Sequence, residues 1–64
     1  MKESDVVKLK EAFKGIPAGT MGTIVLEYDG SFFEVEFYDS NGKTIDVITT
    51  PVSILEIEII IESE

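Results

Sequence analysis

The groups in this chain that could carry chemistry are carboxylates, hydroxyls and lysine amines, because the sequence contains no histidine, cysteine or arginine. Acyl transfer therefore lacks its usual bases and its most reactive nucleophile. Two carboxylates can act as acid and base where burial moves their pKa values apart, and Glu34 and Glu36 are the best candidates for such a pair. Their spacing in an alternating segment predicts that both lie on a solvated outer face. We therefore expect no enzymatic activity and no cofactor.

A metal site is the second chemical possibility. Asp39, Asn41 and Gly42 resemble the start of a calcium-binding loop. The later acidic ligands and the bidentate glutamate of such a loop are missing from the residues that follow. Asp and Asn-Gly are also typical turn residues. We expect a turn here and no bound metal.

The segment from Gly22 to Phe37 predicts the β-hairpin around which the rest of the chain is organised. Phe33, Val35 and Phe37 alternate with polar residues, so one face of this strand is apolar and the other carries carboxylates. Asp29-Gly30 supplies the turn, because glycine accepts a positive φ.

The first strand of the hairpin, residues 23–28, is nearly continuously apolar, which indicates a strand covered on both sides for part of its length. Gly22 at its entrance predicts a bend or a bulge.

The segment before the hairpin allows two interpretations. In residues 5–11, Val7 and Leu9 alternate with lysines and predict a strand, whereas Ser4 and Phe13 fit a capped helix. The adjacent valines favour the strand. Residues 12–21 then predict a glycine-rich loop. We expect Phe13 and Ile16 in this loop to fold back over the core.

The segment after the hairpin predicts two more strands. Residues 43–50 form the first, with Ile45 and Val47 on one face and Ile48 on the other. Pro51 ends its ladder, and residues 51–55 predict a single 3₁₀ turn. Residues 56–62, an alternation of isoleucine and glutamate, predict the last strand.

These elements predict an all-β fold, a small five-stranded SH3-like barrel formed by one domain over residues 1–64. The barrel has a long loop after the first strand and a one-turn 3₁₀ helix before the last. Closure of the sheet would protect its edges.

Several segments together resemble a known family. They are Asp5-Val6-Val7 with Leu9, Gly22-Thr23-Ile24-Val25, Phe33-Glu34-Val35-Glu36-Phe37 with Asp39 and Gly42, and then Thr44-Ile45 and Val47. Over most of residues 5–57 the chain resembles a family of short bacterial proteins known only as a domain of unknown function. The Gly-Thr-Ile-Val segment is also similar to KOW-type barrels of ribosomal and transcription proteins and to the nitrile hydratase β-subunit barrel. The resemblance implies a barrel used for binding, and it transfers no functional residue.

The charge is negative and unevenly distributed. The net charge is −8, and residues 15–64 contain ten acids against one lysine. Such a surface repels phosphate backbones, so we expect no direct binding of nucleic acid. Solubility alone can explain the acids. A functional interpretation is a surface for a basic protein partner, as in an antitoxin, an immunity protein or another inhibitor of a nucleic-acid-handling protein. The contacts that we expect are Glu34, Glu36, Glu56 and Glu58.

Two alternatives use other surfaces. Ile48, Ile60 and Val25 lie on the phase opposite the predicted core and suggest a homodimer, with residues 57–61 as a candidate edge for strand pairing. The lysines near the N-terminus, with a net charge of +1 over residues 1–14, suggest a KOW-like module that contacts RNA or ribosomal protein.

The hydropathy of the chain bears on its localisation. The chain has no apolar run long enough for a signal peptide or a membrane span, so we expect a cytoplasmic protein without a membrane partner. Tyr28, Tyr38, Phe32 and Phe13 can line a peptide groove, but core packing is the simpler role for these rings.

Overall fold

The computed structural model describes residues 1–58 as five antiparallel strands in one sheet. The strands are β1 (Val6–Leu9), β2 (Met21–Glu27), β3 (Phe32–Tyr38), β4 (Thr44–Pro51) and β5 (Leu55–Ile57), and η1 (Val52–Ile54) is a single 3₁₀ turn. The order in the sheet is β4-β3-β2-β1-β5. The predicted all-β class, the long loop after β1 and the 3₁₀ turn before the last strand are confirmed.

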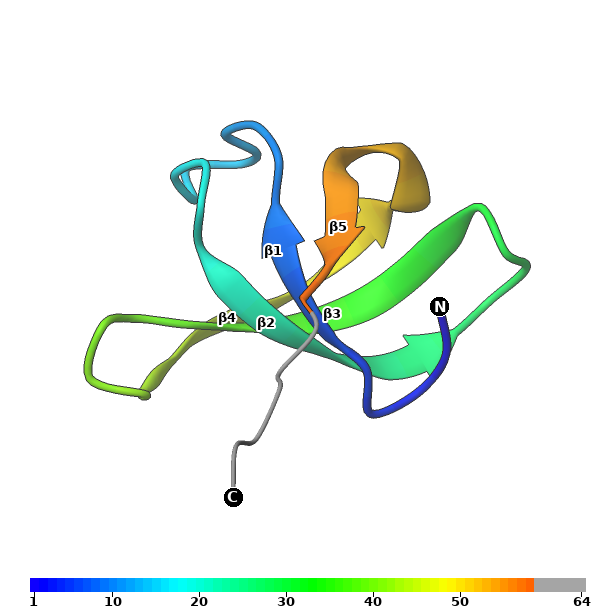
Figure 1. Cartoon of the computed structure of the whole chain (residues 1–64), viewed down its shortest axis with the longest axis horizontal. Helices are drawn as coiled ribbons and strands as arrows, with labels where there is room; N and C mark the ends of the chain where they lie inside the picture. Colours follow the sequence, from blue (N-terminus) through cyan, green and yellow to red (C-terminus); the bar gives the residue numbers. More distant parts are fainter. Residues whose placement is uncertain (59–64) are drawn as a thin grey trace, which may run out of the picture.

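The two edge strands of the sheet, β4 and β5, are joined by only three residues. In a flat sheet, five strands would place the edges about 19 Å apart. The four-residue step from Pro51 to Leu55 spans at most about 15 Å, and a 3₁₀ turn spans less. The sheet must therefore curl, and in Figure 1 β1 and β5 run across the direction of β3 and β4.

The concave side of the sheet holds one apolar core. From β3 it receives Phe33, Val35 and Phe37, which are almost completely buried, so the predicted phase of this strand is confirmed. The remaining buried apolar residues are Val7, Leu9, Ile16, Ile24 and Leu55.

β1 forms a strand, so the helical alternative for residues 5–11 is excluded. It pairs with β2 on one side and with β5 on the other. In the following loop, Phe13 and Ile16 pair through their backbones, Ile16 is buried and Phe13 packs against the core. The predicted return of this loop over the core is confirmed.

The β2–β3 hairpin forms as predicted, with Gly30 at a φ of +85° and the Asp29 carboxylate accepting the Ser31 N–H at 2.9 Å. The prediction of a bend or bulge at Gly22 is wrong. The bulge lies between Ile24 and Leu26, where the register shifts. It leaves the second half of β2 uncovered, and Leu26 is 43% exposed.

Gly22 is required for close packing instead. A Cβ at this position would lie 2.7 Å from Val35 Cγ1 and 2.9 Å from the carbonyl oxygen of Glu36. One of these neighbours is backbone, so it cannot move away without distorting the β2–β3 ladder. A glycine inside a strand has this role where another strand approaches closely.

The predicted phase of β4 is wrong. Ile48 packs against the core and Thr50 is fully buried, whereas Ile45 and Val47 are 47% and 46% exposed. The short connection through η1 fixes this phase, because Leu55 has to enter the core directly after it. Thr50 is tolerated inside because its hydroxyl donates to the carbonyl oxygen of Ile48 at 2.9 Å.

The last strand is shorter than predicted within the described residues. β5 ends at Ile57, which pairs with Val7 but is 42% exposed at the end of the strand. The rest of the predicted strand, residues 59–62, lies outside the described residues, and so does Ile60.

Replacement of Ile48 by alanine tests the phase of β4. We expect Ile48→Ala to lower the free energy of unfolding by about 2 kcal/mol, because it leaves a void beside the core. Val47→Ala, one residue away, should lower it by less than about 1 kcal/mol, because Val47 is exposed. Urea denaturation of both variants measures the difference. A larger loss for Val47→Ala would contradict the observed phase.

Replacement of Gly22 by alanine tests the close approach of β2 and β3. We expect Gly22→Ala to destabilise the fold by about 2–3 kcal/mol through overpacking. Gly42→Asn is the matched control, because its Cβ would meet no atom within 4 Å and asparagine tolerates the positive φ of this turn. It should change the midpoint of thermal unfolding little. Equal losses in both variants would refute the packing role of Gly22.

Candidate functional site

The convex face of β3 carries the two glutamates that the sequence singles out. Glu34 and Glu36 are half-buried on this face, opposite the core residues of the same strand. Leu26 of β2 and Thr49 of β4 flank Glu34. The arrangement places a partly shielded carboxylate beside an exposed aliphatic side chain.

The next row of the same face repeats this arrangement around Glu36. Thr23 of β2 and Val47 of β4 are its cross-strand neighbours. Val47 is 46% exposed. Because β3 lies between β2 and β4, Leu26 and Val47 lie on opposite sides of the glutamate pair. We call the surface formed by Leu26, Glu34, Glu36 and Val47 the glutamate face.

Hydroxyl groups hold the Glu34 carboxylate in place. The Thr49 hydroxyl donates to Oε1 at 2.7 Å, and the Tyr28 hydroxyl reaches Oε2 at 3.5 Å, a weaker contact. An ionised carboxylate accepts about four hydrogen bonds, so Glu34 keeps acceptor capacity for a partner.

Glu36 is held more firmly. The Thr44 hydroxyl donates to Oε2, and the Tyr38 hydroxyl lies 3.3 Å from Oε1 and 3.2 Å from Thr23 Oγ1. A phenol has one proton and a carboxylate only accepts, so Tyr38 donates to Glu36 and Thr23 donates to the phenol oxygen. These bonds restrict the rotamers of Glu36 before any partner arrives, which lowers the entropic cost of binding.

The glutamate face has no lysine within ion-pair distance in the described part of the chain. The two ion pairs found in residues 1–58 are Lys2–Asp5 and Lys8–Glu58. Glu34 and Glu36 therefore present uncompensated negative charge to solvent, which attracts a basic surface over several ångströms.

The other predicted contact residues do not join this face. Glu56 pairs with Lys8 across the β1–β5 ladder, and Glu58 Oε1 lies 3.8 Å from Lys8 Nζ. Strands β1 and β2 separate these glutamates from β3. The four predicted glutamates thus form two pairs. Glu34 and Glu36 have no lysine within ion-pair distance in residues 1–58, whereas Glu56 and Glu58 lie beside Lys8.

Of the aliphatic residues predicted on the outer surface, only Val25 is exposed within the described residues. Ile48 belongs to the core side of β4, so its assignment to an outer surface is wrong. Ile60 lies outside the described residues. Val25 is 42% exposed at the bulge. The exposure of Leu26 and Val47 was not predicted from the sequence. No residue pattern in the sequence indicates the bulge that exposes Leu26. The orientation of Val47 cannot be predicted from alternation, because both phases of β4 contain aliphatic residues.

The Asp39–Gly42 turn forms as predicted. The Asp39 carboxylate accepts the N–H groups of Asn41 and Lys43, both at 2.9 Å, and Gly42 has a φ of +83°. Turn formation thus explains the residues that resemble a calcium loop.

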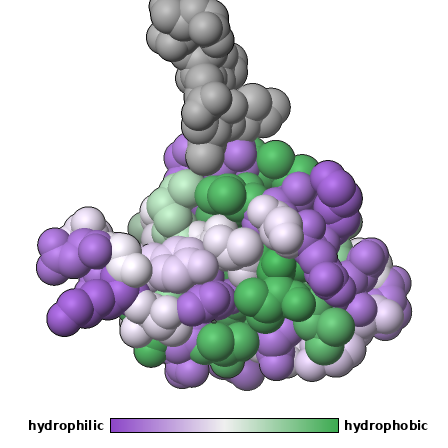
Figure 2. Space-filling model, turned by 90° about the horizontal axis from the view of Figure 1, so that it is seen from below, coloured by the Kyte–Doolittle hydropathy of each residue, from purple (hydrophilic) through white to green (hydrophobic). Residues whose placement is uncertain are grey.

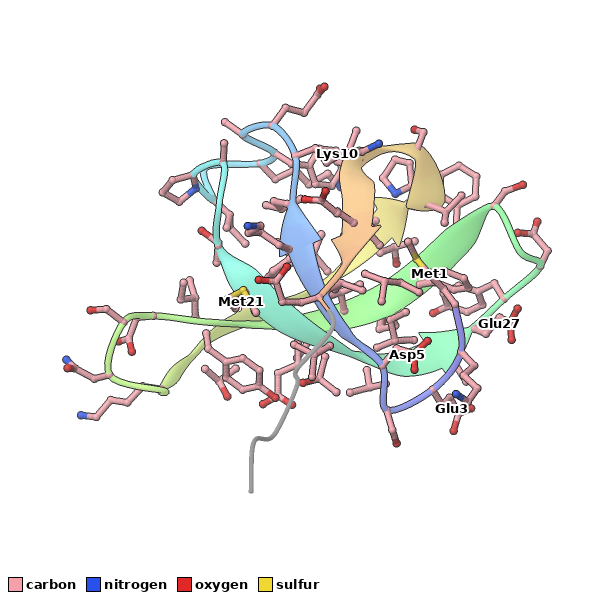
Figure 3. All side chains as sticks on the ribbon, viewed as in Figure 1. Met1, Glu3, Asp5, Lys10, Met21 and Glu27 are labelled. Atoms are coloured by element: carbon pink, nitrogen blue, oxygen red, sulfur yellow. The ribbon has the colours of Figure 1, made fainter. Side chains whose placement is uncertain are left out.

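The pKa of one carboxyl is shifted by the fold. The Lys2 backbone N–H donates to Asp5 Oδ2 at 3.0 Å and, together with the nearby Lys2 charge, lowers the pKa of Asp5. A lowered pKa contributes stability that is present above the ordinary pKa and is lost as the pH falls through the shifted value. This contact fixes the N-terminal segment, which Figure 3 shows at the same end of the molecule as Glu27.

Comparison with known proteins supports a family assignment. A family model described as "Domain of unknown function (DUF4926)" matches residues 3–57, most of the chain. The chain belongs to the DUF4926 family. No curated protein and no solved structure gives a significant match.

The DUF4926 description assigns no activity, and the arrangement of residues 1–58 gives no sign of catalysis. In that same part of the chain no helix is long and apolar enough to cross a membrane. The glutamate face combines hydrogen-bonded carboxylates with exposed aliphatic residues, and it is the functional candidate that we consider on this DUF4926 protein.

Removal of the Tyr38 hydroxyl tests the ordering of Glu36. We expect Tyr38→Phe to loosen the carboxylate, which Thr44 still holds at Oε2, so that the three-bond couplings between the Glu36 α and β protons move part of the way toward rotamer-averaged values. Tyr28→Phe removes only the long contact to Glu34 and should leave Glu36 unchanged. Unaltered Glu36 couplings in Tyr38→Phe would show that the hydroxyl does not hold this side chain.

Proposed function

We propose that this DUF4926 protein is a non-enzymatic, cytoplasmic protein-binding module that docks its glutamate face on a basic surface of a partner protein. The observation that carries the proposal is the pair Glu34 and Glu36, held by hydroxyl groups, flanked by exposed aliphatic residues and outside ion-pair distance of any lysine in residues 1–58. Ordered carboxylates give electrostatic attraction, and Leu26 and Val47 give apolar contact.

The class of partner follows from the charge. Large basic surfaces on proteins are typically those that bind nucleic-acid phosphates. An acidic barrel that covers such a surface acts as an inhibitor or an antitoxin-like partner by occlusion. Electrostatic steering increases the association rate of such pairs by about ten- to a thousandfold.

The SH3-like assignment is part of this proposal. Its support is the strand order β4-β3-β2-β1-β5 together with the 3₁₀ turn that joins the two edge strands. The similarity to KOW-type and nitrile hydratase β-subunit barrels rests only on the Gly-Thr-Ile-Val segment of the sequence. The absence of cysteine fits the proposed cytoplasmic location.

The two alternatives have less support. The homodimer relied on Ile48, which packs against the core. Pairing through the edge of β4 is also hindered, because the Asp46 carboxylate accepts the Val47 N–H at 2.8 Å and Pro51 has no N–H. For RNA binding, two of the N-terminal lysines, Lys2 and Lys8, are already in ion pairs with carboxylates.

Charge reversal on the glutamate face tests the proposal. The bait Glu34→Lys/Glu36→Lys is compared with Glu3→Lys/Glu11→Lys, two exposed glutamates far from β3 in the chain. Both baits change the net charge equally. We expect basic proteins to be captured from the native lysate by the wild type and the control bait, and to be lost with the β3 bait.

The captured partner then permits a kinetic measurement. The association rate of the β3 variant should fall by about tenfold or more at low ionic strength, and its salt dependence should weaken. Capture of the same proteins by all three baits, with equal salt dependence, would refute the role of the glutamate face.

A further inference from the structure

A hollow of about 400 Å³ lies at one end of the glutamate face. One wall is the end of the β1–β2 loop and the start of β2, residues 17–21. The other wall is Tyr38, the following turn and Ile45. Met21, which belongs to the first wall, lies on the part of β2 close to the β3–β4 ribbon in Figure 3. Figure 2 shows hydrophobic patches separated by hydrophilic residues on the side of the molecule seen from below.

Hydrogen bonds hold the loop wall in place. The Gly19 N–H donates to the Leu9 carbonyl at 2.8 Å, and the Leu9 N–H donates to the Thr20 carbonyl at 3.0 Å. The Thr20 hydroxyl also donates to the Pro17 carbonyl at 2.7 Å. The loop is thus tied to β1 at two points, and the hollow is formed before any ligand binds.

A bulge shapes the opposite wall. The pairing of β3 with β4 passes from Phe37↔Asp46 to Tyr38↔Thr44, so Ile45 has no partner and is 47% exposed. The adjoining turn is fixed by Asp39 Oδ1, which accepts the backbone N–H groups of Asn41 and Lys43. The hollow exposes more apolar than polar surface, and Pro17, Met21 and Ile45 are among its apolar lining residues.

Tyr38 connects the hollow to the glutamate face. Its side chain lines the hollow, and its hydroxyl contacts Glu36 Oε1 at 3.3 Å. An apolar site that ends at an uncompensated carboxylate matches a ligand with an apolar group next to a cation.

We propose that the hollow binds an aliphatic side chain of the basic partner, presented by a segment in which a neighbouring lysine or arginine pairs with Glu36. This inference rests on the proposed function and adds its specificity. The glutamates attract any basic surface, whereas the hollow accepts only one that offers an apolar residue beside the positive charge. The continuity of the hollow with the glutamate face favours a protein segment over an unrelated small molecule.

Two peptides of equal charge test the inference. The probes are acetyl-Lys-Leu-Lys-amide and acetyl-Lys-Gly-Lys-amide, titrated into ¹⁵N-labelled protein and followed by amide chemical shifts. We expect the leucine peptide to shift the amides of Met21, Tyr38 and Ile45 and to bind at least about fivefold more tightly, since one buried side chain contributes more than 1 kcal/mol. The glycine peptide should affect only the surroundings of Glu34 and Glu36.

Variants separate the two parts of the site. Ile45→Ser should abolish the preference for the leucine peptide, whereas Val25→Ser, an exposed aliphatic residue outside the hollow, should retain it. Glu36→Gln should weaken both peptides. Equal affinity of the two peptides, or no effect of Ile45→Ser on the preference, would show that the hollow is not a binding site. The proposed function would then be decided by the charge-reversal experiment alone.

Two further outcomes also overturn the inference. No detectable binding of either peptide would show that the hollow does not accept this class of ligand. Shifts of the hollow's amides that depend on protein concentration, without peptide, would show that a second copy of the chain occupies it.

Discussion

The three-residue connection between the two edge strands constrains the whole structure. β4 and β5 lie at opposite ends of the strand order, so η1 can join them only if the sheet curls. The curl creates the concave side on which a chain of 64 residues builds its single core. It also creates the convex side, on which Glu34 and Glu36 remain in contact with solvent.

The strands that alternate strictly were predictable from the sequence. In β3, three large apolar residues on one phase and glutamates on the other leave one reasonable orientation. The turn at Asp29-Gly30 was equally clear, because glycine there takes a positive φ. β4 was not predictable in this way. Ile45, Val47 and Ile48 place aliphatic residues on both phases, so alternation alone indicates no single orientation, and the short connection through η1 fixes it.

Only the charged residues of the candidate site could be predicted from the sequence. The sequence identified Glu34 and Glu36, but two of their hydroxyl partners, Thr44 and Thr49, come from β4, whose register with β3 contains a bulge. A second bulge lies in the pairing of β2 with β3. Single-residue irregularities of this kind depend on cross-strand packing and carry no local pattern. The same irregularities expose Leu26 beside the glutamates and Ile45 in the wall of the hollow.

The most direct test of the glutamate face as the contact surface is zero-length carbodiimide cross-linking of the native complex, followed by mass spectrometry. This chemistry joins a carboxylate to a lysine only where the two are in contact. We expect cross-links from Glu34 or Glu36 to lysines of the partner. Cross-links confined to carboxylates away from β3, such as Glu3 and Glu11, would contradict it.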